Sequence, residues 1–156
     1  MRYISFAFVV AACVSAGCAG GETATFEGVV ADHRDESTVE YRDCGTASQG
    51  NVCEETVSAP MMCFTDAYAA CEPAELHLDE TGIDAAFVKV LFVEPSGDGC
   101  RVTAFTDHSA DGFKGDYGDF IEDDCAGAAL EEFPEEEATC VRLSIQGCEA
   151  RQEWYE

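Results

Sequence analysis

The chain opens on an apolar run that carries no charge. Arg2 comes just before this run, which extends over thirteen residues from Ile4 to Ala16, and small residues follow it. A positive residue ahead of a short apolar core is the pattern of a secretory signal. The run is shorter than the roughly 20 apolar residues that cross a bilayer. We therefore predict a signal peptide over residues 1–17.

One helix is predicted in the middle of the chain. Ser58 is a candidate N-cap and Pro60 falls in the first turn, which is where proline is tolerated in a helix. Pro73 ends the pattern. Between them, apolar residues recur at helical spacing and form one stripe, namely Cys63, Phe64, Ala67, Ala70 and Cys71.

The strongest strand pattern lies at residues 85–94, where apolar residues fall on both faces. This is typical of a central strand that is covered on both sides. A turn at residues 95–99 and a second strand at residues 100–106 complete a predicted hairpin. Residues 117–121 are expected to pair antiparallel with residues 102–106. The alternation at residues 141–145 predicts a last strand.

Three other segments have weaker patterns. Residues 26–31 and 38–41 are predicted to form a hairpin around the polar stretch between them. Residues 44–56 are expected to be a loop held at both ends by cysteine, and the acidic segment 122–137 a solvated loop. The predicted fold is α+β, with one helix packed on a small antiparallel sheet in a single domain over residues 26–156.

Cysteine is the most informative residue type in the body of the chain. Two of the ten cysteines belong to the export segment, and eight remain. An even number in a small exported domain predicts disulfides, here four. A zinc site is the competing interpretation, but it favours closely spaced C-x-x-C pairs, which the chain lacks. The eight are Cys44, Cys53, Cys63, Cys71, Cys100, Cys125, Cys140 and Cys148.

Local geometry restricts which cysteines can pair. Two cysteines eight positions apart on a helix lie roughly 12 Å apart along its axis, beyond the ~7 Å Cα limit of a disulfide. Cys63 and Cys71 should therefore bond to other partners. The same applies to Cys140 and Cys148, which a straight strand separates by roughly 26 Å. The expected strand pairing favours a bridge between Cys100 and Cys125.

Charge narrows the possible partners. The chain has 32 acidic and 8 basic residues and a formal net charge of −24. Nucleic acid is not expected as a partner, because phosphate binding requires a basic surface. An acidic surface attracts cationic ligands, holds divalent cations or maintains solubility in salt. The expected partner is an unidentified protein or cationic molecule.

Residues 15–18, Ser-Ala-Gly-Cys, resemble the lipobox of bacterial lipoproteins, in which the cysteine is acylated and becomes the new N-terminus. This resemblance implies lipidation at Cys18, a tether over residues 18–25 and anchoring in a lipid bilayer by more than one acyl chain. Ala19, in place of Asp, resembles lipoproteins sent to an outer membrane. Cys13, in a second lipobox-like stretch, is the alternative. An ordinary signal peptide cut near Ala16 is another, and it implies a periplasmic or secreted protein.

One motif could bind a ligand. Asp107, Ser109 and Asp111 have the alternating spacing of oxygen ligands in a calcium loop, with Gly112 at the sixth position. The twelfth position, Gly118, lacks the glutamate of an EF-hand. A loop in which Asp and Ser side chains bond to their own backbone amides is the alternative. The sequence predicts no cofactor other than calcium. No catalytic motif appears, so no enzymatic activity is expected.

The lipobox at Cys18, the stretch Cys71-Glu-Pro-Ala74 and the run from Cys100 to Phe113 together resemble small cysteine-rich, acidic, poorly characterised lipoproteins of myxobacteria-type Gram-negative bacteria. The resemblance implies an anchored, exported α+β domain and brings no catalytic residues. The expected function is a binding or structural role at the cell envelope. The alternatives are a freely secreted, disulfide-rich inhibitor or effector and a calcium-dependent binding module.

Overall fold

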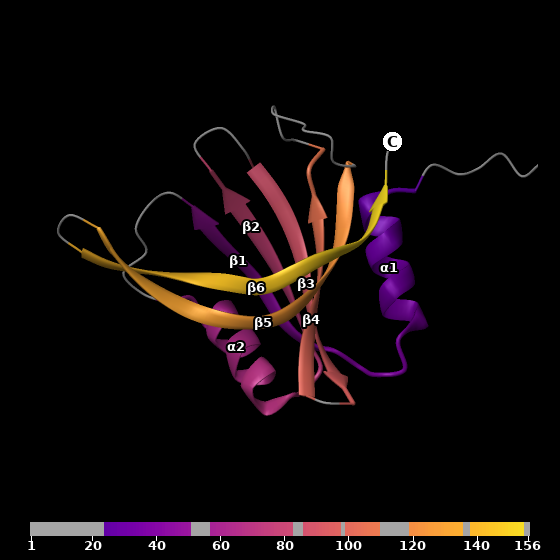
Figure 1. The fold of residues 1–156 in the computed structure, drawn as a ribbon, viewed down its shortest axis with the longest axis horizontal. Coiled ribbons are helices and arrows are strands. Elements are labelled where there is room, and N and C mark those ends of the chain that lie inside the picture. Colours follow the sequence, from indigo (N-terminus) through magenta and orange to yellow (C-terminus); the bar gives the residue numbers. More distant parts are fainter. Residues whose placement is uncertain are drawn as a thin grey trace, which may run out of the picture.

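The computed structural model describes residues 24–50, 57–82, 86–97, 99–109, 119–135 and 138–154. They form a six-stranded sheet and two helices (Figure 1). In chain order the elements are α1 (Phe26–Glu36), β1 (Arg42–Gly50), α2 (Ala59–Ala70), β2 (Ala74–Thr81), β3 (Ala86–Ser96), β4 (Gly99–Asp107), β5 (Phe120–Glu135) and β6 (Ala138–Trp154).

The strands lie side by side in the order of the chain, from β1 to β6. β1 and β2 are parallel, and α2 is the crossover between them, as parallel neighbours require. The other four pairings are antiparallel. The predicted combination of helix and sheet is confirmed. The sheet is larger than predicted, however, and it is mixed, because β1 is a strand and not part of a loop.

The helix predicted after Ser58 is α2. The Ser58 hydroxyl accepts a hydrogen bond from the backbone N–H of Met61, and proline lies in the first turn. The helix ends at Cys71, which is in the left-handed conformation with a φ of 56°. Its buried side chains are Met61, Phe64 and Ala67, and Phe64 has no exposed surface.

The main core lies between α2 and the sheet. It contains Leu76, Leu78, Leu91, Val93 and Val102 from the central strands. The long ribbon of β5 and β6 curves across the front of the sheet in Figure 1, and its residues Ala128 and Leu143 join the same core. α2 is therefore enclosed by the sheet and the ribbon.

Two side chains fasten this ribbon. The Tyr68 hydroxyl of α2 donates a hydrogen bond to the carbonyl of Ala126 in β5. The Gln49 side chain of β1 accepts a hydrogen bond from the backbone N–H of Leu143 in β6 and donates one to its carbonyl. The Gln49 carboxamide thus pairs with β6 in the way a neighbouring strand would.

α1 packs on the opposite face of the sheet. Val30 of α1 forms a second, smaller core with Val90, Phe92 and Phe105 of β3 and β4. The predicted hairpin at this position is wrong. The Thr25 hydroxyl caps the helix by accepting a hydrogen bond from the N–H of Gly28, and apolar residues at 26, 29 and 30 follow helical spacing.

β3 confirms the pattern predicted for residues 85–94. Leu91 and Val93 belong to the core beneath α2, whereas Val90 and Phe92 belong to the core beneath α1. The strand lies between β2 and β4, and the predicted hairpin of β3 with β4 is present. A strand buried on both faces needs apolar side chains at successive positions, which explains why its sequence does not alternate.

Three described disulfides cross-link these elements. Cys44 of β1 is bonded to Cys63 of α2. Cys71, at the end of α2, is bonded to Cys100 of β4. The third joins residues that face each other on β5 and β6, Cys125 and Cys148. α2 is therefore stapled at both ends, and Cys63 and Cys71 have separate partners, as the helix geometry predicted.

The predicted bridge between Cys100 and Cys125 is wrong. Cys100 lies beside the end of α2, whereas Cys125 lies directly opposite Cys148 with a Cα separation of 3.9 Å. Cys140 is also disulfide-bonded, and Cys148 is not its partner. Cys53 lies outside the described residues.

Besides β1, two strands went wholly or largely unrecognised in the sequence. β2 was not predicted, and most of the segment expected to be an acidic loop, residues 122–137, belongs to β5. β5 pairs with β4 through residues 120–125 and with β6 along its whole length. Its acidic side chains at 122–124, 131 and 132 are compatible with a strand because none of them is buried.

Candidate functional site

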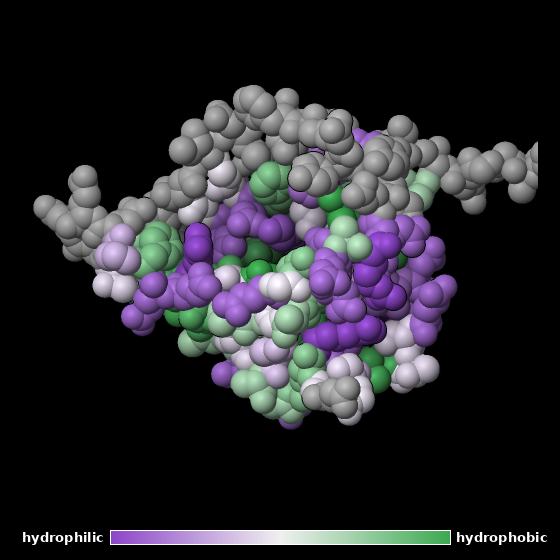
Figure 2. All heavy atoms as spheres, in the orientation of Figure 1, coloured by the Kyte–Doolittle hydropathy of each residue, from purple (hydrophilic) through white to green (hydrophobic). Residues whose placement is uncertain are grey.

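A cavity of about 590 Å³ lies between α1 and the adjoining face of the sheet. The helix wall is formed by Val29, Asp32, His33 and Glu36. The sheet wall carries both charges and one aromatic ring, and its residues are Glu94, Arg101, Phe105, Glu122 and Arg151. In Figure 2 hydrophilic residues dominate the surface over α1, at the right of the view.

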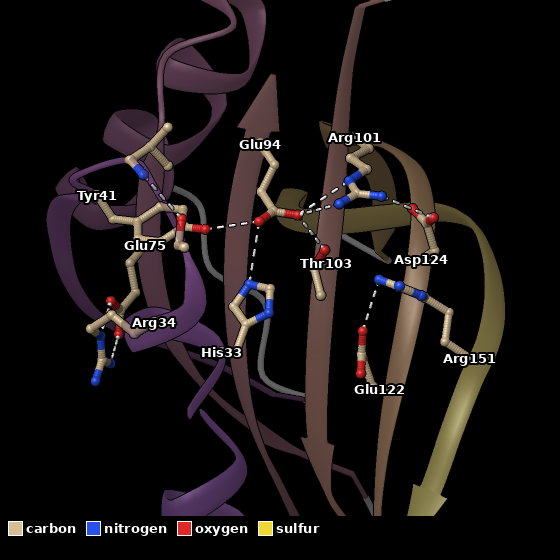
Figure 3. Close-up of polar contacts among 12 residues, drawn as sticks. His33, Arg34, Tyr41, Glu75, Glu94, Arg101, Thr103, Glu122, Asp124 and Arg151 are labelled. Carbon is tan, nitrogen blue, oxygen red and sulfur yellow. Dashed lines mark hydrogen bonds and ion pairs between the residues drawn. The ribbon is translucent and has the colours of Figure 1, made fainter. Parts of the chain in front are cut away.

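Glu94 of β3 is at the centre of the polar contacts in this cavity (Figure 3). Its Oε1 accepts a hydrogen bond of 2.8 Å from the Tyr41 hydroxyl. Its Oε2 accepts one of 2.8 Å from the Thr103 hydroxyl and one of 3.2 Å from Nε of Arg101. With His33 also in contact, each carboxylate oxygen has two polar neighbours.

These contacts fix the charge of Glu94. Burial raises the pKa of this carboxyl. The contacts with the His33 ring and with the hydroxyls of Thr103 and Tyr41 lower the pKa by more than burial raises it, and the net result is a pKa of about 2. For Tyr41, burial is the largest cause, and the pKa is raised to about 12. Glu94 is therefore anionic and Tyr41 neutral throughout the physiological pH range.

His33 brings the last turn of α1 against Glu94. Its Nε2 lies 3.3 Å from Oε1 of Glu94, within ion-pair distance but without the alignment of a hydrogen bond. Among the described residues it is the one buried side-chain nitrogen or oxygen that lacks a hydrogen-bond partner. The ring packs against Phe92 and Phe105, with centroid distances of 4.8 and 5.0 Å. His33 thus closes the inner end of the cavity.

The two arginines of the sheet wall are each paired with carboxylates. Arg101 bridges Glu94 and Asp124, with a separation of 3.6 Å to the second carboxylate. Arg151 of β6 contacts Glu122 of β5 at 2.9 Å. Their side chains are 39% and 47% exposed, so both guanidinium groups remain accessible from the cavity.

A second ion pair holds α1 on its other side. Arg34 forms a bidentate contact with Glu75 of β2, with distances of 3.0 Å and 2.5 Å, and the carboxylate is 10% exposed. His77 Nε2 also lies 2.9 Å from Glu75. Neighbouring residues of one helical turn, His33 and Arg34, therefore reach carboxylates on two adjacent strands.

The contacts of Glu94 restrict the chemistry of this carboxylate. The oxygens of Glu94 are occupied by donors, so it is poorly suited to take a proton from a substrate. No group of three or more His, Cys, Asp or Glu side chains among the described residues is placed to hold a metal ion. The cavity instead presents charged groups that can bind charged parts of a ligand.

Asp107 and Ser109, which the sequence suggested as calcium ligands, do not line this cavity. Asp107 Oδ1 accepts a hydrogen bond of 2.7 Å from the backbone N–H of Ser109, which is the turn geometry of the non-calcium interpretation. Asp111, Cys13 and Cys18 lie outside the described residues. Sequence analysis missed Glu94, His33 and Arg101, which are far apart in the chain and form no motif. The one signal was a glutamate at the end of a strongly apolar strand.

No family model, curated protein or solved structure matches this chain. Neither α1 nor α2 has the length and apolar character needed to cross a membrane, and they are the helices of the part that the structure describes.

Proposed function

We propose that this protein is an exported lipoprotein, anchored in the outer membrane through acylated Cys18, and that its folded part binds a small ligand in the cavity beside α1. The proposal assigns it a binding role at the cell envelope and no catalytic activity.

The state of the cysteines carries the proposal of export. All seven cysteines among the described residues are disulfide-bonded, from Cys44 to Cys148. Such bridges form and persist in oxidising compartments outside the cytoplasm. The apolar run that ends at the lipobox provides the route to that compartment, and residues 18–25 join the anchor to α1.

The cavity supports the binding role. Its volume of about 590 Å³ lies within the usual range for small-molecule sites, roughly 300–1,000 Å³. Its walls carry polar groups held in place by the contacts of Glu94, Glu122 and Arg101. Groups that are positioned before a ligand arrives lower the entropy lost on binding.

Metabolic labelling with a fatty-acid analogue tests the anchor. The wild-type protein should incorporate label and sediment with outer membranes, Cys18→Ala should lose the label, and Cys13→Ala is the matched control that should retain it. If Cys13→Ala lost the label and Cys18→Ala retained it, the acylated residue would be Cys13. An unlabelled wild-type protein in the culture medium would instead support the freely secreted inhibitor or effector.

Blocking the cavity tests the binding role. Val29 of α1 lines the cavity. Val88 of β3 is 41% exposed and lies beside the other side of α1, so it provides a control position. The purified protein would be incubated with a small-molecule extract of the envelope, washed, denatured and analysed by mass spectrometry for released compounds. A compound retained by wild type and Val88→Trp but not by Val29→Trp supports the proposal. Equal retention by all three proteins contradicts it.

A further inference from the structure

We infer that the cavity beside α1 takes a zwitterion, whose ammonium group binds the helix wall at Asp32 and Glu36 and whose carboxylate binds the sheet wall at Arg151 and Arg101. This inference rests on the proposed function and adds the chemical class of the ligand.

The helix wall offers two carboxylates that are free to bind a cation. Asp32 and Glu36 both line the cavity, and their spacing of four residues places them on the same face of α1. Neither forms a hydrogen bond or ion pair with another described residue. Glu94 and Glu122 at the same cavity, in contrast, are paired with arginines.

The sheet wall offers donors that its own carboxylates do not use up. An arginine has five N–H donors. Arg151 directs NH1 to Glu122, and Arg101 uses Nε and both terminal nitrogens on Glu94 and Asp124. Arg151 is the more exposed of the two, and its remaining N–H groups can bind an incoming carboxylate in bidentate geometry.

The helix wall presents unpaired carboxylates and the sheet wall presents spare arginine N–H donors, a combination that selects against ligands with a single charge. A pure anion approaches the two unpaired carboxylates and a chain with a net charge of −24. A pure cation meets the helix wall but makes no use of the arginine N–H donors that Glu94, Asp124 and Glu122 leave over. A zwitterion satisfies both walls, and such complementarity provides specificity. Phe105 and Val29 also line the cavity and supply apolar surface for the carbon chain between the two charges.

The size of the cavity favours a molecule longer than a common amino acid. Two sources fit the same chemistry, namely an amino-acid-like molecule with a long carbon chain and a short peptide with free ends. Both carry one ammonium and one carboxylate separated by several bonds.

NMR titration of the natively oxidised, ¹⁵N-labelled protein tests the inference with three probes of equal chain length. They are 5-aminopentanoate, pentylamine and pentanoate, and triglycine serves as the peptide arm. We expect 5-aminopentanoate to shift the amides of α1 and β6 at the cavity with an affinity about tenfold or more above that of either singly charged probe, equivalent to about 1.4 kcal/mol. Triglycine binding more tightly still would identify the peptide source.

Matched variants locate the two charges. The double variant Asp32→Asn with Glu36→Gln should weaken the binding of both 5-aminopentanoate and pentylamine. Its control, Glu27→Gln with Asp35→Asn, removes the same amount of charge from α1 away from the cavity and should leave the binding of both probes unchanged. Arg151→Gln should weaken the binding of 5-aminopentanoate but not that of pentylamine. Its control, Arg142→Gln, removes another β6 arginine, which contacts Glu131 outside this cavity.

Three outcomes would overturn the inference. Equal binding of pentylamine and 5-aminopentanoate at the cavity would make the ligand a simple cation, and the proposed binding role would stand. If the Glu27→Gln, Asp35→Asn control lost as much affinity as the Asp32→Asn, Glu36→Gln variant, the effect would come from the net charge of the protein and not from the cavity. No shift at the cavity with any probe would reject the zwitterion, while the Val29→Trp retention experiment would still decide the binding role.

Discussion

The two helices are held on the sheet by different means. α2 packs one face into the main core, and disulfides fasten it near both ends, through Cys63 and Cys71. α1 buries one side chain fully, Val30, and none of its described residues takes part in a disulfide. Its last turn is held by two carboxylates, Glu94 and Glu75, which contact His33 and Arg34.

This difference separates the covalently stapled part of the molecule from the part in which we propose that a ligand binds. Apolar burial and covalent bridges around α2 stabilise the fold. The polar contacts beneath α1 leave a cavity whose groups keep their charges. α1 is also the first described element after the proposed anchor at Cys18, so the helix wall of the cavity follows soon after the proposed tether in the sequence.

Truncating the largest fully buried side chain of α2 is the strongest test of this division. Phe64 has no exposed surface, so Phe64→Ala should lower the free energy of unfolding by about 3–5 kcal/mol. Met62 on the same helix is 46% exposed, and Met62→Ala should cost less than about 0.5 kcal/mol. Urea denaturation of the oxidised proteins measures both. Similar costs for the two variants would show that α2 is not the centre of the core.

Removing the bridge at the end of α2 should have the next largest effect. Cys71→Ser with Cys100→Ser opens a disulfide whose residues are 29 apart in sequence, and the expected loss of stability is about 3.6 kcal/mol in the chain-entropy model. Urea denaturation compares this double variant with wild type. Peptide mass spectrometry is the control, since it should still find Cys44 with Cys63 and Cys125 with Cys148. An unchanged unfolding midpoint would mean that apolar packing alone holds α2.

The sequence predicted α2 better than α1 because their signals differ. α2 has a serine N-cap, a first-turn proline and an uninterrupted apolar stripe, all within one short segment. α1 has a threonine cap and four apolar residues among charged ones, and the apolar run at residues 29–31 is also compatible with a strand. Local pattern alone could not decide between these structures.

The limits of sequence reasoning were greater for the ribbon and for the cavity. β5 contains acidic pairs that are typical of a loop, yet its pairing with β4 and β6 provides hydrogen bonds that no local pattern indicates. The cavity joins residues from α1, β3, β4, β5 and β6. Contacts such as that of Tyr41 with Glu94, 53 residues apart, exist only once the sheet has formed.

The smallest expected effect, and the one that tests the α1 side of the comparison, is that of Glu94→Gln. The amide retains one acceptor oxygen but loses the charge that faces Arg101 and His33, so we expect a loss of about 2 kcal/mol at neutral pH. Glu132→Gln is the control, because Glu132 is exposed on β5 and should change stability by less than about 0.5 kcal/mol.

The dependence on pH distinguishes a charge effect of Glu94 from a loss of packing. The pKa of Glu94 is lowered from its ordinary value of 4.5 to about 2 in the folded protein, so the unfolded chain binds the proton first as acid is added. The stabilisation by this carboxylate is therefore complete above about pH 4.5 and is lost as the pH falls towards 2. Urea denaturation across this range should show the difference between wild type and Glu94→Gln shrinking as the pH falls, whereas the difference between wild type and Phe64→Ala should stay nearly constant. A constant difference for Glu94→Gln would mean that α1 is held by its apolar contacts, as α2 is, and that its ion pairs contribute little.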